Sequence, residues 1–321
     1  MIELALEVSV VVATHARPRY LERALRSVLA QTHPAREIIV VDDNAGLPSA
    51  RAQTTALIAS LRAELPAGTS LIHRILPESL GGAGARNRGA GEATGEYLAF
   101  LDDDDWWLPE KLEKQVAAFE TASLSEPQTT QAKSPSEPPG MVYTSRRIVG
   151  PSGKTKRVRA AIREGDMADA LLAENVVGTT SCAMIRREVF EAVGGFDPSL
   201  PAQQDIDLWV RIAKLYRIQA IDSPLTVQQE HDEGRISRSI ETKAKGLRMF
   251  LDKHHESIAR RPKVLARHYA RIGRHYLKYR YPLRGRYYMF RAFLARPTPG
   301  TVFRAVKGIR RRRHGHEKDT T

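Results

Sequence analysis

The sequence of 321 residues lacks several features that would place a protein in a special class. Its single cysteine, Cys182, cannot form an intramolecular disulfide, so a disulfide-stapled secreted scaffold is excluded. No apolar run approaches the roughly 20 residues that a membrane-spanning helix requires. The N-terminus carries Glu3 and Glu7 in place of the basic residues that open a signal peptide. Together these absences predict a folded cytoplasmic protein.

The positive charge of the chain is concentrated at one end. The sequence contains 50 Lys and Arg against 37 Asp and Glu, a net charge of +13. Residues 241–321 contain 23 basic and 5 acidic residues, a net charge of +18, so the preceding 240 residues carry −5. The charge distribution indicates a mildly acidic body, placed at 1–238, and a strongly basic C-terminal region at 239–321. Basic regions of this kind bind nucleic acids or anionic membrane surfaces.

Strand and helix signals alternate along the first hundred residues. Continuous apolar runs at 8–12 and 38–41 are typical of strands that are buried on both faces. Two further strands are expected at 71–76 and 97–101, with helices in the intervals. This alternation predicts an α/β fold with a mostly parallel, Rossmann-like central sheet flanked by helices. Such sheets bind ligands beyond the carboxyl ends of their strands.

The remainder of the chain is less regular. Residues 122–140 are rich in Ser, Thr, Pro and Gln and predict a flexible insertion. Beyond residue 239 the spacing of apolar residues predicts three or four helices. The other expected elements are helices near 109–120, 167–173 and 205–215 and strands at 141–148, 156–160 and 180–185.

Four consecutive carboxylates, Asp102 to Asp105, directly follow the strand expected at 97–101. Adjacent carboxylates repel one another by about 1 kcal/mol per pair at ~4 Å in water, and by more where water is excluded, so the cluster needs a cation. In an extended segment Asp102 and Asp104 point the same way, and their oxygens suit Mg²⁺ or Mn²⁺. The alternative is a solvated acidic loop in which Asp105 caps the helix that begins near Pro109.

Two further polar clusters lie beside expected strands. Asp42 and Asp43 end the second strand, where a carboxylate can bind a base or a ribose hydroxyl. The alternative is a turn formed with Asn44. Arg86 follows a glycine run, 81–84, at the start of a helix, where backbone N–H groups and a guanidinium suit a phosphate. The alternative there is a simple glycine turn with a solvated Arg86.

Asp205 lies at the N-terminus of the helix expected at 205–215. Helical spacing places it on the inward face together with Trp209. The dipole at the helix N-terminus favours the ionised carboxylate, which a general base requires. Asp207 points elsewhere and is expected to pair with Arg211, four residues further on. The alternative is that Asp205 only caps the helix.

These motifs, in this order and spacing, resemble the glycosyltransferase family 2 enzymes over roughly residues 6 to 235. The resemblance implies a GT-A fold and the transfer of a sugar from a nucleotide donor, most simply a UDP-sugar, with inversion at the anomeric carbon. The motifs are Val8-Ser9-Val10-Val11-Val12-Ala13-Thr14-His15-Ala16-Arg17, Ile39-Val40-Val41-Asp42-Asp43, Gly84-Ala85-Arg86-Asn87-Arg88-Gly89, Gly95-Glu96-Tyr97-Leu98-Ala99-Phe100-Leu101-Asp102-Asp103-Asp104-Asp105, Gly194-Gly195-Phe196-Asp197 and Asp205-Ile206-Asp207-Leu208-Trp209.

The resemblance also implies which residues bind the donor and the metal. A divalent cation, Mn²⁺ or Mg²⁺, would be held by Asp102 and Asp104, which match the family's Asp-x-Asp motif. His231 falls where many members carry a closing loop and would reach the metal or the diphosphate, or else be a surface histidine. The residues that would contact the nucleotide sugar are Thr14, Arg17, Asp42, Asp43, Arg86, Asp102 and Asp103.

The resemblance makes Asp205 the catalytic base. The family commonly has Glu-Asp where this chain has Gln204-Asp205, so one neighbouring charge is absent. The hydroxyl that Asp205 deprotonates would belong to a glycan or to a lipid-linked acceptor, as in the biosynthesis of cell-surface polysaccharides or glycolipids. The residues that would border this acceptor are Gly195, Phe196, Gln204 and Trp209.

The basic C-terminal region interleaves cations with aromatic residues, as at 271–281 and 284–294. With the apolar residues of 302–309 and the run Arg310 to Arg313, this pattern predicts basic amphipathic helices that bind an anionic membrane surface from the cytoplasmic side. The alternatives are a helical appendage packed on the catalytic domain and, less favoured, nucleic-acid binding.

For the whole chain, the alternatives to a glycosyltransferase are a nucleotidyltransferase, which would not need Asp205, and a basic nucleic-acid-binding protein.

Overall fold

The computed structural model describes residues 7–123, 138–230, 240–279 and 281–297. The chain divides into two compact units, each described by itself below. The first comprises Met1–Leu171, Asn175–Ser199 and Gln204–Gly234, and the second comprises Leu172–Glu174, Leu200–Gln203 and Arg235–Thr321. Several sequence predictions lie outside the described residues: His231, the domain boundary at 238–239, most of the insertion at 122–140, and everything beyond residue 297.

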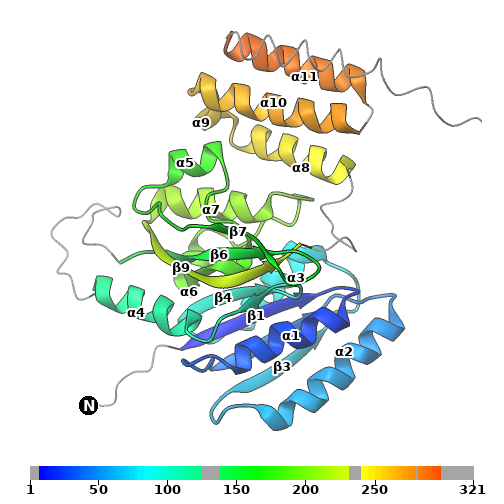
Figure 1. Ribbon diagram of the computed structural model, residues 1–321, viewed down its shortest axis with the longest axis vertical. Helices are drawn as coiled ribbons and strands as arrows, with labels where there is room; N and C mark the ends of the chain where they lie inside the picture. Colours follow the sequence, from blue (N-terminus) through cyan, green and yellow to red (C-terminus); the bar gives the residue numbers. More distant parts are fainter. Residues whose placement is uncertain (1–6, 124–137, 231–239, 280, 298–321) are drawn as a thin grey trace, which may run out of the picture. The chain divides into compact units, whose positions relative to one another are not determined.

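The first unit is built on a nine-stranded sheet (Figure 1). Its strands are β1 (Val8–Thr14), β2 (Glu37–Asp42), β3 (Ser70–Ile75), β4 (Tyr97–Asp102), β5 (Trp106–Trp107), β6 (Met141–Val149), β7 (Thr155–Arg159), β8 (Ala183–Arg186) and β9 (Ile218–Gln229). The strand order is β3-β2-β1-β4-β8-β6-β9-β5, with β7 paired to β6. The half formed by β3, β2, β1 and β4 is parallel, as the sequence predicts. The other half is antiparallel except where β6 pairs with β9.

Helices cover both faces of the parallel half, which explains why its strands are continuously apolar. The helices of this unit are α1 (Pro18–Leu29), α2 (Pro48–Leu61), the 3₁₀ turn η1 (Arg62–Glu64), α3 (Gly81–Ala90), α4 (Lys111–Ser123), α5 (Ala168–Ala173), the 3₁₀ turn η2 (Thr180–Cys182), α6 (Arg187–Ala192) and α7 (Gln204–Leu215). Apolar residues of α1, α2 and α4 form one core with Val10 and Val12. On the opposite face α3 approaches so closely that a Cβ on Gly89 would lie 2.5 Å from Val11 Cγ1.

The register of the parallel strands brings the predicted polar clusters to one edge of the sheet. Thr14 at the end of β1 lies opposite Asp42 at the end of β2. Ala13 lies opposite Asp102 at the end of β4. The expectation that these clusters share the carboxyl edge is therefore confirmed, and this edge positions the site described below.

The antiparallel half departs from the sequence predictions in three strands, of which the short β5 was not expected. The long strand β9 was not expected, because Asp222 and Pro224 interrupt its apolar pattern; its pairing with β6 shifts register around Ser145. The strand expected at 180–185 begins instead as η2, where the Thr179 hydroxyl accepts a hydrogen bond from the backbone N–H of Ser181. Strand β8 therefore starts at Ala183.

A lysine is fully buried where α4 begins. The ammonium group of Lys111 donates a hydrogen bond of 2.5 Å to Gln115 Oε1 and lies 4.0 Å from the centroid of the Trp107 ring. Gln115 in turn donates from Nε2 to the backbone oxygen of Val142 at 2.9 Å. Burial lowers the pKa of Lys111 to about 7. The charged form is therefore disfavoured in the folded protein.

The second unit consists of helices, as expected for its described part: α8 (Ile240–Lys253), α9 (His255–Ala259), α10 (Pro262–Lys278) and α11 (Pro282–Ala295). Within this unit α10 lies between α8 and α11 (Figure 1). Helices α10 and α11 pack so closely that a Cβ on Gly285 would lie 2.6 Å from Leu277 Cγ. Among the described residues, none of the helices combines the length and apolar character required to span a bilayer.

The buried lysine leads to a prediction about stability and pH. An unfolded lysine keeps its proton up to about pH 10.4, whereas folded Lys111 releases it near pH 7. Between these values the unfolded state binds more protons, so stability rises with pH. Relative to Lys111→Met, we expect the free energy of unfolding of the wild type to rise by roughly 2 kcal/mol from pH 7 to pH 9 in chemical denaturation. The control is Lys114→Met on the exposed side of the same helix; parallel pH curves for wild type and Lys111→Met would contradict the prediction.

Candidate active site

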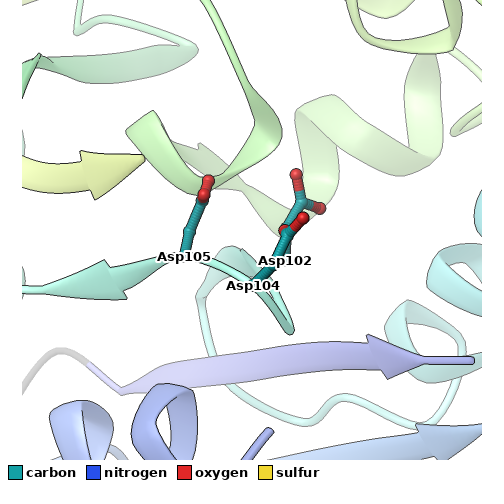
Figure 2. Close-up of side chains that lie close together, drawn as sticks. All are labelled: Asp102, Asp104 and Asp105. Carbon is teal, nitrogen blue, oxygen red and sulfur yellow. The ribbon is translucent and has the colours of Figure 1, made fainter. Parts of the chain in front are cut away.

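The four residues Asp102 to Asp105 form a turn at the carboxyl edge of the sheet, here named the acidic turn. The backbone N–H of Asp105 donates to the carbonyl oxygen of Asp102 at 3.0 Å and closes the turn. Figure 2 shows that the carboxyl groups of Asp102, Asp104 and Asp105 point to the same side. One oxygen of each lies within 4.8 Å of the others. The expected convergence of Asp102 and Asp104 is therefore present, but it arises from a turn and includes Asp105.

Two arginines bring positive charge to the acidic turn. Arg17, the residue before α1, pairs with Asp103 Oδ1 and with Asp104 Oδ2, each at 2.7 Å. Arg86 from α3 pairs with Asp102 Oδ1. Asp103 is completely buried and also accepts a hydrogen bond of 2.8 Å from the Thr14 hydroxyl. The alternative of a solvated acidic loop is therefore wrong, because these carboxylates are enclosed and paired.

Hydroxyl groups at η2 complete the surroundings of the turn. Asp105 Oδ2 accepts hydrogen bonds from Ser181 Oγ at 2.8 Å and from Thr179 Oγ1 at 3.1 Å. Asp102 Oδ1 accepts from Thr180 Oγ1 at 2.8 Å. Asp105 does not cap α4, contrary to the alternative considered for it. Gln31 Oε1 accepts from the first free N–H of that helix instead.

The surroundings shift the pKa values of Asp102, Asp103 and Asp105 in different directions. Burial raises the pKa of Asp103 to about 7, against the opposing effect of Arg17. Burial, with repulsion from Asp104 and Asp102, also raises the pKa of Asp105 well above its ordinary value. Burial acts the same way on Asp102, but Arg86 and the hydroxyl donors hold the pKa of Asp102 below its ordinary value. Ionising all four groups together is thus costly without further positive charge.

The composition of the acidic turn fits a hard divalent cation. Asp102, Asp104 and Asp105 offer carboxylate oxygens alone, the donors that Mg²⁺ and Mn²⁺ prefer. Asp102 and Asp104 are the two metal ligands that the sequence predicts from the Asp-x-Asp motif. Asp105 was missed because its side-chain direction depends on the turn, and the third candidate, His231, lies outside the described residues.

Asp42 and Asp43 both bind other parts of the protein. Asp42 is completely buried; its Oδ1 accepts from the backbone N–H of Asn44 at 3.0 Å and its Oδ2 lies 3.3 Å from His73 Nε2. These contacts outweigh the effect of burial and lower the pKa of Asp42. Asp43 accepts from the backbone N–H groups of Leu80 and Gly81 at 2.8 and 3.0 Å. The start of α3, where the sequence favoured a phosphate, is therefore capped by a carboxylate.

The candidate base Asp205 lies in the first turn of α7. Its Oδ2 accepts a hydrogen bond of 2.8 Å from Asn175 Nδ2, and Asn175 also binds the backbone N–H of Gly178. Burial raises the pKa of Asp205, with a further increase from Asp102, although backbone N–H donors and Arg86 oppose it. The sequence argument from the helix dipole predicted the opposite direction. A raised pKa makes the carboxylate a stronger base.

The candidate acceptor residues divide into two groups. Phe196 and Trp209 are 1% and 0% exposed, so their side chains belong to the core. The backbone at Phe196 is fixed by two hydrogen bonds with the amide of Asn87, at 2.7 and 2.9 Å. Gly195 lies in the same loop, where its carbonyl oxygen accepts from Arg211 at 2.6 Å. Gln204 is partly exposed, with its amide oxygen near α3.

Arg211 also forms the predicted ion pair with Asp207, at 2.9 Å. The guanidinium of Arg211 also connects α7 to the loop that contains Gly195, because it donates to the carbonyl oxygen of that residue. Three supporting groups were missed from the sequence: Asn175, Asn87 and the hydroxyls of 179–181. The available signal was the run Thr179-Thr180-Ser181, whose polar side chains do not suit the start of a buried strand.

Comparison with known proteins settles the family. Residues 9–194 match the model of glycosyl transferase family 2. The chain belongs to glycosyltransferase family 2. An uncharacterised glycosyltransferase of Nostoc sp. is 33% identical over 201 residues, which cover 60% of this chain and 55% of that protein. The amylovoran biosynthesis glycosyltransferase AmsB of Erwinia amylovora is 29% identical over 221 residues, 68% of this chain and 67% of that protein.

Solved structures support the fold. Residues 1–349 of S. aureus TarS, crystallised in complex with UDP-GlcNAc, align with a TM-score of 0.58 at 15% identity, covering 94% of this chain and 79% of that chain. The likeness identifies the α/β architecture of the first unit as a GT-A fold. The family match over residues 9–194 makes this part of the chain a glycosyltransferase domain and not the nucleotidyltransferase considered as its alternative.

The pairing of Arg17 with two carboxylates leads to a prediction about stability. In Arg17→Met the buried Asp103 loses its cationic partner, and breaking a buried ion pair costs about 3 kcal/mol. We expect a loss of that order in chemical denaturation, with most of it recovered in the double variant Arg17→Met/Asp103→Asn. Arg19→Met, two residues away and exposed, is the control. Equal stabilities of Arg17→Met and Arg19→Met would show that the pair contributes nothing.

Proposed function

We propose that this glycosyltransferase moves a sugar from a UDP-sugar to a hydroxyl group of a glycan or lipid-linked acceptor, with Mn²⁺ or Mg²⁺ bound at the acidic turn. The observation that carries the proposal is the convergence of three carboxylates close to a candidate base: Asp102 is near enough to Asp205 to shift its pKa. The UDP-GlcNAc complex of TarS supports the choice of donor. The naming of AmsB for amylovoran biosynthesis supports an acceptor in polysaccharide synthesis.

The nucleotide part of the donor would bind along the carboxyl edge of β1, β2 and β4. We propose that Asp42 binds the nucleobase of the donor. Its carboxylate can accept a further hydrogen bond beyond those with Asn44 and His73. Arg17 and Arg86, with Thr14 and Asp103 beside them, would line the diphosphate. Both guanidiniums already bind carboxylate oxygens, and a diphosphate offers them similar anionic acceptors. Asp43 would act on the nucleotide indirectly, by holding the start of α3.

Asp102 and Asp104 are the proposed metal ligands, with Asp105 as a third. When bound there, a divalent cation neutralises the diphosphate and stabilises it as the leaving group. The chain prepares this site through its own contacts. Thr180 and Arg86 favour the ionised form of Asp102, and Ser181 orients the carboxylate of Asp105.

Asp205 is the proposed general base. Its Oδ1 or Oδ2 would take the proton of the acceptor hydroxyl while that oxygen attacks the anomeric carbon and the bond to the diphosphate breaks. A single displacement of this kind inverts the configuration. Asn175 would hold the carboxylate in position, and Gly195 and Gln204 would border the acceptor.

We also propose a division of labour along the chain. Residues 1–238 would form the catalytic domain, and 239–321 would form a basic helical region that contacts an anionic membrane surface on the cytoplasmic side. A lipid-linked acceptor is presented at such a surface. Attraction between a basic region and anionic lipids would therefore bring the enzyme to its substrate.

The metal proposal is tested by Asp104→Asn. Loss of one carboxylate ligand weakens the site, so Mn²⁺ together with a UDP-sugar should no longer raise the melting temperature of the variant. For the wild type, ligand at about 100 times its dissociation constant stabilises by ~2.7 kcal/mol. Glu110→Gln, an exposed carboxylate outside the turn, serves as the control. A metal-dependent shift of wild-type size in Asp104→Asn would refute the assignment.

The proposal that Asp205 is the general base is tested by Asp205→Asn. The amide keeps the shape of the side chain but cannot accept the proton, so transfer should slow by about 10²- to 10⁴-fold while donor affinity stays unchanged. Because the pKa of Asp205 is raised, the wild-type rate should fall with decreasing pH at a higher pH than an ordinary aspartate would give. Transfer rates are measured with donor in excess, and an undiminished rate in Asp205→Asn would remove this residue from the mechanism.

A further inference from the structure

The outward face of α11 carries a line of exposed apolar side chains. Leu283, Tyr287, Phe290 and Leu294, here named the α11 stripe, are 79%, 52%, 57% and 60% exposed. They follow one another at intervals of four, three and four residues, which places them along one line of the helix surface. With Tyr281 they account for five of the eleven large apolar side chains that are exposed in the described residues. Apolar groups gathered in this way mark an interaction surface.

Packing within the second unit does not use the α11 stripe. The buried residues of α11 are Gly285, Met289 and Ala292, which lie on the opposite side of the helix. That side meets α10, where Met289 comes close to Gly273. Figure 1 shows α11 as the outermost helix of the group α8, α10 and α11. The side chains of the stripe therefore take no part in the packing of α11 against α10.

Cations flank the stripe on both sides. At about 100° per residue, Arg284 and Arg291 lie to one side of the line and Arg286 to the other. Arg284 and Arg286 are exposed, and Arg291 donates from Nη1 to the Tyr287 hydroxyl at 3.1 Å. The helix contains no acidic residue between Pro282 and Ala295. A line of apolar side chains bordered by arginines is the arrangement of a helix that lies in a membrane interface, since the long stems run along the apolar layer while the charges reach the headgroups.

We propose that the α11 stripe binds an anionic lipid bilayer, with α11 lying in the plane of the interface. The inference deepens the proposed contact of the C-terminal region with a membrane and rests on it. Leu283, Phe290 and Leu294 enter the boundary between headgroups and acyl chains, and Tyr287 sits at headgroup level. The flanking arginines bind lipid phosphates.

Charge and composition favour lipid over the other partners that an exposed helix face can bind. A second copy of the helix would bring its arginines against those of the first with no acidic residue between them, and like charges repel. Nucleic acid would gain little from Leu283 and Leu294, which neither stack on bases nor pair with phosphates. An anionic bilayer satisfies both parts of the surface, because it offers an apolar layer beneath a negatively charged one.

The experiment uses the full chain and vesicles of phosphatidylcholine, with or without phosphatidylglycerol, in a co-sedimentation assay. The variant Phe290→Ser/Leu294→Ser removes half of the stripe, and its control, Leu215→Ser, removes an apolar side chain of similar exposure in the first unit. The variant Arg286→Glu reverses a flanking charge, and its control, Lys245→Glu, makes the same charge change on the exposed side of α8. Hydrolysis of a UDP-sugar is followed in parallel for every protein.

We expect the wild type to bind the anionic vesicles and not the neutral ones. Binding should weaken at least about tenfold in the stripe variant and about tenfold in Arg286→Glu, while both controls bind as the wild type does. Donor hydrolysis should be the same in all five proteins. Circular dichroism confirms that the stripe variant keeps its helices, as expected from the exposure of the replaced side chains.

The contrary outcomes separate the two proposals. Equal vesicle binding by wild type and stripe variant would overturn the role of α11 while leaving membrane contact elsewhere in the C-terminal region. No vesicle binding by a wild type that hydrolyses its donor would overturn the membrane contact and the stripe together, without touching the proposed reaction. A wild type that self-associates in sedimentation, in a manner lost with the stripe, would identify the surface as a protein interface and overturn the inference.

Discussion

Four adjacent carboxyl groups at the end of β4, three of them buried, are the constraint on which the rest of the first unit depends. Their repulsion has to be offset by positive charge and by hydrogen-bond donors. Arg17 comes from the start of α1, Arg86 from α3, and the hydroxyls of 179–181 from η2. The acidic turn therefore ties together segments that are distant in sequence. The site is therefore complete only in the folded sheet.

The groups around the candidate base extend this arrangement. Asn175 binds Asp205, Asn87 fixes the backbone at Phe196, and Arg211 joins α7 to the loop at Gly195. None of these three side chains donates or accepts the proton that is transferred in the proposed reaction. In the proposed reaction they would hold the groups that meet the donor and the acceptor in place before the reaction begins.

Sequence reasoning succeeded where a local pattern decides the structure. The buried strands at 8–12 and 38–41 were predicted because both of their faces are apolar, and the polar clusters at strand ends followed from the parallel topology. It failed where distant contacts decide. Strand β9 carries Pro224 and is stabilised by its pairing with β6, Asp105 is turned toward η2, and burial outweighs the helix dipole at Asp205. The exposure of the α11 stripe likewise depends on which side of the helix meets α10.

In the proposed function the acidic turn would bind the diphosphate of a UDP-sugar with the help of a divalent cation. Calorimetric titration of the wild-type protein with UDP, in the presence and absence of Mn²⁺, tests it most directly. We expect saturable binding of UDP with Mn²⁺ and at least about a hundredfold weaker binding without it, a difference of ~2.7 kcal/mol. Equal affinity for UDP with and without the cation would contradict it.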